Sequence, residues 1–132
     1  MLMKKKQIIT VFFVLMLSCV NAISLSAQVR NEKRINLHHK GNLQNHFDHP
    51  VLADQPDVYL DTSNAVIIID GGGEVTYYDV EITSMMTWYV VISTQVSGYY
   101  DTIDVSSLTS GDYIITISSP TGNEFEGEFT IN

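Results

Sequence analysis

The sequence has little that could crosslink the chain and little positive charge over most of its length. Cys19 is its only cysteine, so no disulfide can form within the chain. Residues 41–132 contain no Lys or Arg, whereas thirteen Asp or Glu lie between Asp54 and Glu128. So acidic a stretch repels nucleic acid and anionic membrane surfaces, and neither is an expected partner of this part of the chain.

Groups that could carry catalysis are also scarce. All four histidines precede residue 51, so the region predicted to fold has no histidine to act as the base of a serine or cysteine hydrolase. The glycine run at residues 71–73 is not followed by Lys and Ser/Thr, which excludes a phosphate-binding loop. Glu124, Glu126 and Glu128 share one strand face, where three like charges are more often a solvated surface than a catalytic pair. We expect no enzyme activity and no cofactor.

Residues 1–27 have the organisation of a secretory signal peptide. Three lysines precede an apolar run over residues 8–20, and a short polar stretch leads to Ala27. The apolar run is too short for a transmembrane helix. Export to the periplasm or cell surface is therefore expected, by one of two routes. The signal is cut near Ala27, or Cys19 is lipidated to give an outer-membrane lipoprotein, the one form in which we expect membrane attachment.

Residues 28–53 are predicted to form a flexible arm that is basic and rich in histidine. The arm has little hydrophobic periodicity, and it contains His38, His39, His46 and His49. His46 and His49 are weak candidates for a zinc or copper site, because nothing in the pattern fixes the orientation of their rings. A polar tether is the preferred interpretation, without a bound metal.

Residues 54–132 are predicted to form an all-β domain, an immunoglobulin-like β-sandwich of about seven antiparallel strands. Short alternating segments separated by turn signals are typical of that fold. The segment at residues 65–69 is apolar on both faces, so it is expected at the centre of a sheet. Trp88 is expected in the core, since a sandwich of this size usually buries one large aromatic residue. The predicted strands cover residues 58–60, 65–69, 74–82, 88–93, 99–105, 113–117 and 124–131.

The domain is organised around residues 102–117, TIDVSSLTSGDYIITI. The spacing of Leu108, Gly111 and Tyr113 is that of the corner leading into strand F of an immunoglobulin-like sandwich. In that corner the tyrosine hydroxyl bonds back to the preceding turn. These three residues are therefore predicted to be structural.

Tyrosines on outward faces are the candidate ligand-facing residues. They are Tyr77, Tyr89 and Tyr99, the last with Tyr100 as its alternative. Exposed aromatic rings beside acidic groups can stack on sugars or anchor a protein partner. Tyrosine is also a good strand former that simply covers a sheet.

Three segments, VEITSMMTWYVVIS, TIDVSSLTSGDYIITI and GNEFEGEFTI, resemble the small secreted immunoglobulin-like proteins of Bacteroidetes grouped as domain-of-unknown-function family 3244. The likeness covers residues 56–132 and the preceding signal and tether. The turn at residues 84–87 departs from the glycine-containing turn usual there, which leaves the register of that hairpin open. The resemblance implies an exported all-β domain without an established activity. Its strongest motifs are Asp104-x-Ser106-x-Leu108-x-x-Gly111-x-Tyr113 and Gly127-Glu128-Phe129.

These observations predict an exported, non-enzymatic binding module of the bacterial cell envelope, with a protein or a glycan as its partner. A small inhibitor of a secreted protease, acting through a loop or strand edge, is the alternative. The least favoured hypothesis is a metal-binding or catalytic protein that uses the histidines. The oligomeric state is left open.

Overall fold

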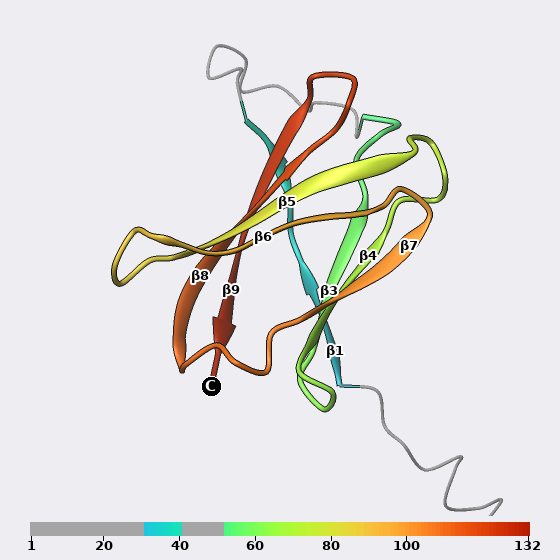
Figure 1. Cartoon of the computed structure of the whole chain (residues 1–132). Coiled ribbons are helices and arrows are strands. Elements are labelled where there is room, and N and C mark those ends of the chain that lie inside the picture. Colours follow the sequence, from blue (N-terminus) through green and yellow to red (C-terminus); the bar gives the residue numbers. More distant parts are fainter. Residues whose placement is uncertain (1–30, 41–51) are drawn as a thin grey trace, which may run out of the picture. The chain divides into compact units, whose positions relative to one another are not determined.

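The structure, a computed structural model, describes residues 31–40 and 52–132. These residues form nine strands in two antiparallel sheets that pack as a β-sandwich, which confirms the predicted all-β architecture (Figure 1). The four-stranded sheet has the order β1 (Glu32–Ile35), β3 (Asp57–Asp61), β4 (Val66–Asp70), β7 (Tyr100–Asp104). The five-stranded sheet has the order β2 (His38–His39), β9 (Glu124–Ile131), β8 (Gly111–Ser118), β5 (Tyr77–Ser84), β6 (Val90–Ser97).

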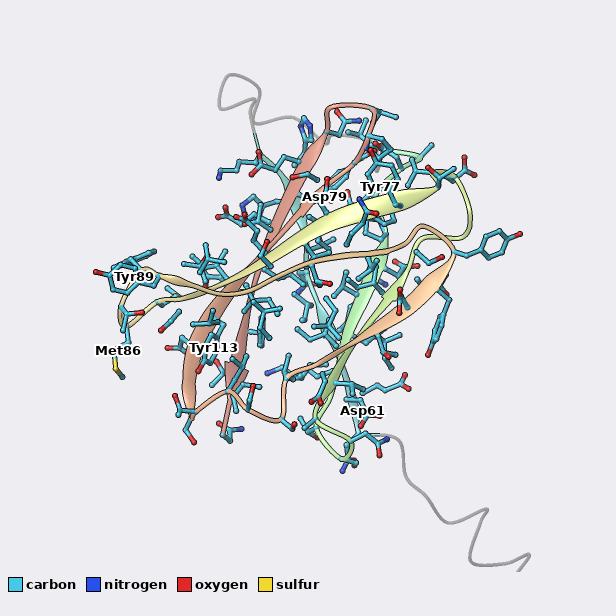
Figure 2. The ribbon with its side chains drawn as sticks, viewed as in Figure 1. Asp61, Tyr77, Asp79, Met86, Tyr89 and Tyr113 are labelled. Carbon is cyan, nitrogen blue, oxygen red and sulfur yellow. The ribbon has the colours of Figure 1, made fainter. Side chains whose placement is uncertain are left out.

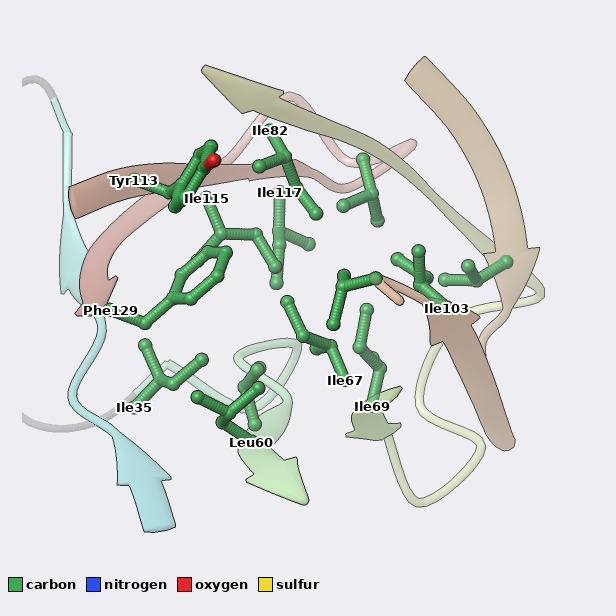
Figure 3. Packing of buried hydrophobic residues seen from close by; sticks show 14 of the residues in the cluster. Ile35, Leu60, Ile67, Ile69, Ile82, Ile103, Tyr113, Ile115, Ile117 and Phe129 are labelled. Carbon is green, nitrogen blue, oxygen red and sulfur yellow. The ribbon is translucent and has the colours of Figure 1, made fainter. Parts of the chain in front are cut away.

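The core lies between the sheets and is built by the predicted alternation. On β5 the inward residues Tyr78, Val80 and Ile82 are fully buried, because every second side chain of a strand points to the same face. Ile82, Ile115 and Ile117 of the five-stranded sheet face Leu60, Ile67 and Ile69 of the other (Figure 3). In β4, residues 67–69 are all buried and the strand lies between β3 and β7, as its two-sided apolarity predicts.

The predicted tyrosine corner is present at the start of β8. Leu108 lies in the turn before it and packs against the core. Gly111 has a φ of 154°, which L-residues rarely adopt. The Tyr113 hydroxyl donates to the Thr109 carbonyl over 2.6 Å, and its ring stacks on Phe129 at 5.6 Å between centroids. Leu108, Gly111 and Tyr113 therefore have the structural role that their spacing predicts.

A nearly buried carboxylate joins the start of the domain to the β8–β9 turn. Asp54 accepts hydrogen bonds from the Thr121 hydroxyl at 2.6 Å and the Asn123 amide at 2.9 Å, and its carbonyl accepts one from the buried Tyr78 hydroxyl. Burial acts to raise the pKa of Asp54, but hydrogen bonds from Thr121, Asn123 and Ser119 outweigh it and hold the pKa below its ordinary value. Burial, with the nearby Asp54 carboxylate, raises the pKa of Tyr78 to about 12.

The prediction of a flexible arm over residues 28–53 is wrong for its middle part. β1 pairs with β3 of one sheet and β2 pairs with β9 of the other, so the chain crosses between sheets at Asn36. Gly127 permits the crossing, because a Cβ there would lie 2.8 Å from the Asn36 carbonyl oxygen. The segment contributes one buried core residue, Ile35, and Leu37 packs against the core while partly exposed, so its apolar residues are too few to give the periodicity of a strand. Residues 28–30 and 41–51 lie outside the described residues.

The prediction that Trp88 belongs to the core is also wrong, since its side chain is 66% exposed. Trp88 ends the turn between β5 and β6, where its N–H donates to the Ser84 carbonyl over 2.7 Å and its φ is 59°. In this left-handed conformation the side chain does not take the inward direction that the alternation of a strand would give it. Tyr78 and Phe125 are instead the largest fully buried side chains. β6 accordingly begins at Val90, and the open register is settled by a bulge opposite Ile82 and Thr83.

Candidate functional site

The hairpin of β5 and β6 ends in a cluster of exposed apolar side chains. Met86 is 84% exposed, Trp88 66% and Tyr89 75%, and Val90 and Val91 continue the surface along β6. Met86 and Tyr89 lie together at the end of the hairpin (Figure 2). We call these five residues the hairpin tip. Contiguous exposed apolar surface of this kind marks interaction sites on soluble domains.

The backbone of the tip is held in place from both strands. The Ser84 N–H donates to the Tyr89 carbonyl over 3.0 Å, and the Met85 N–H donates to the Asp112 carbonyl of the loop end of β8 over 3.0 Å. The Thr87 hydroxyl accepts from the Tyr89 N–H. The tip therefore presents its side chains from a closed, hydrogen-bonded turn, which lowers the entropy lost when a partner binds.

Trp88 occupies a backbone conformation that disfavours it. A φ near +60° costs an L-residue roughly 1–2 kcal/mol, and glycine is the usual occupant of such a position. The side chain does not recover this cost by burial, because it is mostly exposed. Backbone strain of this kind is often found at binding sites.

The structure does not gather the three tyrosines singled out by sequence. Tyr89 belongs to the hairpin tip, whereas Tyr77 starts β5 at its other end and pairs with Ser97. Eight residues of β5 span about 26 Å at the rise of a strand, so the two tyrosines are far apart. Tyr99 lies beyond β6 and covers Gly73, where an added Cβ would meet its ring at 2.6 Å. No single aromatic platform results from Tyr77, Tyr89 and Tyr99.

The outer face of the five-stranded sheet carries a shallow acidic depression of about 560 Å³. Its carboxylates come from β5 and β9, and that of Asp79 is engaged, because the Gln95 amide donates to it over 3.1 Å. The acidic stripe of β9 is partly neutralised from the arm, since the Lys40 ammonium lies 3.4 Å from Glu124 and 3.5 Å from Glu126. Glu124 and then Glu126 raise the pKa of Lys40. The depression is lined by Asp79, Val80, Glu81, Ser93, Thr94, Gln95, Thr116, Ser118 and Glu124.

A second hollow, of about 320 Å³, lies between β1 and β9. Lys33 and Arg34 face it from one sheet and Asp112 and Glu128 from the other, over an apolar floor that includes Phe129. Arg34 already pairs with Asp57 at 2.8 Å, and Asp112 already accepts from the Thr130 hydroxyl. Arg34 and Asp112, two of the four charged groups on its rim, are therefore already engaged within the chain.

The metal and lipidation candidates stay untested. His46, His49 and Cys19 lie outside the described residues. His38 and His39 form β2, and the ring of His39 contacts Phe125 at 5.8 Å between centroids. Within residues 31–40 and 52–132, no group of three or more His, Cys, Asp or Glu is placed to hold a metal ion. The same residues include no helix long and apolar enough to cross a membrane.

The comparisons with known proteins bear on the fold. No family model and no curated protein matches the sequence. A crystal structure of a DUF3244 family protein with an immunoglobulin-like β-sandwich fold, from Bacteroides vulgatus ATCC 8482, matches with a TM-score of 0.60. The match covers 76% of this chain and 99% of that chain. The fold is an immunoglobulin-like β-sandwich. The identity is 16%, so the expected resemblance to this family is confirmed as a likeness of structure, and it carries no specific function.

Met86 and Trp88 are the surface residues that sequence reasoning missed. Their signal is the run MMTWYVVI at residues 85–92, which contains no charge and no glycine. If the run is interpreted as a strand, the turn within it is missed. If it is interpreted as a turn, it places large side chains at positions where small polar ones are usual.

Proposed function

We propose that this protein is an exported, non-enzymatic binding module of the bacterial cell envelope that recognises a protein partner through the hairpin tip. The observation that carries the proposal is the exposure of Met86, Trp88 and Tyr89 on one hydrogen-bonded turn. Tryptophan and tyrosine are the residues most enriched among those that dominate binding energies. Methionine adapts its shape to a partner at little cost. Export rests on the signal-like pattern of residues 1–27.

A protein partner is favoured over a glycan by the chemistry of the tip. Met86, Val90 and Val91 offer no hydrogen-bonding side chain, whereas a sugar needs polar groups around the ring on which it stacks. The tyrosines that could have formed a stacking platform are separated along the sheet. The acidic depression has polar groups, but none of its lining residues is aromatic.

An inhibitor that occupies a protease active site as an extended strand is disfavoured by the backbone. The tip is a closed turn in which the Trp88 N–H bonds to the Ser84 carbonyl, and Trp88 has a positive φ. Extended segments that add to a partner as strands need main-chain groups that are free along their length.

Photocrosslinking in the producing cell tests the proposal. A photoreactive amino acid at position 86 is expected to give a discrete adduct with one envelope protein, which is then identified and purified. The matched control places the same group at Pro120, which is equally in a hairpin turn and exposed. Replacing Trp88 and Tyr89 by alanine should abolish the adduct and weaken binding of the purified partner by at least tenfold.

Three results would contradict a protein partner at the hairpin tip. Adducts that are identical from positions 86 and 120, or absent from both, would remove the tip as a binding surface. A glycan array on which Tyr89→Ala loses a signal given by the parent protein would replace the protein partner with a sugar. Binding to neutral phospholipid vesicles that depends on Trp88 would replace it with a membrane.

A further inference from the structure

β6 is an edge strand that lacks the usual protection. It closes one end of the five-stranded sheet and pairs only with β5. Its eight residues, VVISTQVS, include no charged residue and no proline, the two commonest devices that keep an edge from pairing with another chain. Among the described strands, the other edges are guarded. β1 and β7 carry charged residues, and β2 has only two residues.

The hydrogen bonding of β6 shows which main-chain groups are open. The Gly98 N–H donates to the Thr76 carbonyl, so alternate residues back to Ile92 turn their main-chain groups toward β5. The N–H and C=O groups of Ser93, Gln95 and Ser97 therefore point away from the sheet. The Asp101 carboxylate already accepts the Ser97 N–H over 2.9 Å. The open groups of the regular part of the strand are those of Ser93 and Gln95.

The acidic side chains beside this opening favour a positively charged partner. Ser93 lies opposite Glu81 and Gln95 opposite Asp79 on the outer face of the sheet. The Gln95 amide engages Asp79, whereas Glu81 has no side-chain partner among the residues that the structure describes. Neighbouring strands lie about 4.8 Å apart, so a basic side chain on a strand next to β6 has only the small Ser93 between it and Glu81. The stem of lysine or arginine is long enough to cross that gap.

We propose that the β6 edge at Ser93 and Gln95 accepts an extended, basic segment of a protein partner as an added strand, with a lysine or arginine of that segment paired with Glu81. Main-chain hydrogen bonds give such additions affinity, and the alternate side chains give them specificity. This inference rests on the proposed function and deepens it, because an added strand that continues past Val91 reaches the hairpin tip.

The charge of the domain favours this occupant over a second copy of the chain. The described residues carry fourteen Asp or Glu and three Lys or Arg, and all three basic residues precede residue 41. A second copy would bring its own Asp79 and Glu81 toward the same edge and no basic residue on β6. A basic segment gains attraction where a copy gains repulsion.

Two synthetic decapeptides test the inference with protein purified after expression of the full chain. Both alternate valine and threonine, and their central threonine is replaced by lysine in one and by glutamate in the other. We expect the lysine peptide to bind at least tenfold more tightly by fluorescence anisotropy. Glu81→Lys should reverse that preference, while Glu128→Lys, an equal change on the same face at β9, should leave it intact.

A second variant tests the strand addition itself. Ser93→Pro removes an N–H that points away from β5, so the ladder inside the sheet is kept. We expect unchanged thermal unfolding and loss of both peptides. Equal binding of the two peptides, no binding of either, or a dimer that Ser93→Pro dissociates would each overturn the inference. The crosslink at position 86 would persist in Glu81→Lys if only the inference, and not the proposed function, is wrong.

Discussion

Replacing Tyr113 by phenylalanine isolates the energy of the tyrosine corner. The change removes the 2.6 Å hydrogen bond to the Thr109 carbonyl and keeps the ring that stacks on Phe129. A hydrogen bond contributes about 0.5–1.5 kcal/mol net, and a buried acceptor left without a partner costs up to about 3 kcal/mol. Thr109 is exposed, so water can replace the lost donor and the larger cost of an unpaired buried acceptor does not apply. We expect a loss of about 1–1.5 kcal/mol in the free energy of unfolding.

Urea unfolding of the purified protein measures this loss. The midpoint should fall while the dependence on urea stays the same, because the change does not alter the surface exposed on unfolding. For a domain of this size the loss corresponds to a fall of roughly 5–10 °C in Tm. Tyr89→Phe is the matched control, since it removes the hydroxyl of a tyrosine that is 75% exposed and should change stability by less than about 0.5 kcal/mol. Equal effects of the two substitutions would refute the role assigned to the corner.

Three further changes probe other contacts. Because hydrogen bonds lower the pKa of Asp54, its contribution to stability is present above its unfolded pKa and is lost as pH falls through the folded value. Asp54→Asn should therefore flatten the fall in unfolding free energy below about pH 4, and an unchanged acid limb contradicts this. Gly127→Ala should cost about 1–3 kcal/mol and speed hydrogen exchange at the Lys40 N–H, because its Cβ meets the Asn36 carbonyl. Trp88→Gly should stabilise the protein by about 1 kcal/mol by relieving the positive φ, yet abolish crosslinking at position 86. A less stable variant would show that the turn needs the indole.

The part of the fold that could be predicted from sequence is the part built by local alternation. β5, β8 and β9 each repeat an apolar residue at every second position, and the corner at Tyr113 has its own spacing. These predictions are confirmed because the buried residues of each strand recur at every second position of one short segment. β1 has no such signal, since its place depends on a backbone gap at Gly127, far along the chain.

The candidate site was harder to predict for a related reason. Large apolar side chains are usually buried, which is why Trp88 is predicted to lie in the core, but the structure exposes it. The outcome was decided by one backbone angle in a turn without glycine, which alternation cannot encode. The open edge of β6 was equally hidden, because strand order is set by long-range pairing. Tyr89 was identified as outward-facing, but the neighbours that make it part of a surface were not.

The pairing of β2 with β9 also sets the order in which the protein can fold. Lys40 bonds to Glu124, 84 residues later, so one of the first strands made is completed by the last. Contacts of such separation form late, because a long loop must close before they gain anything. The five-stranded sheet therefore cannot close its β2 edge until Phe125 and Glu126, near the end of the chain, have been synthesised.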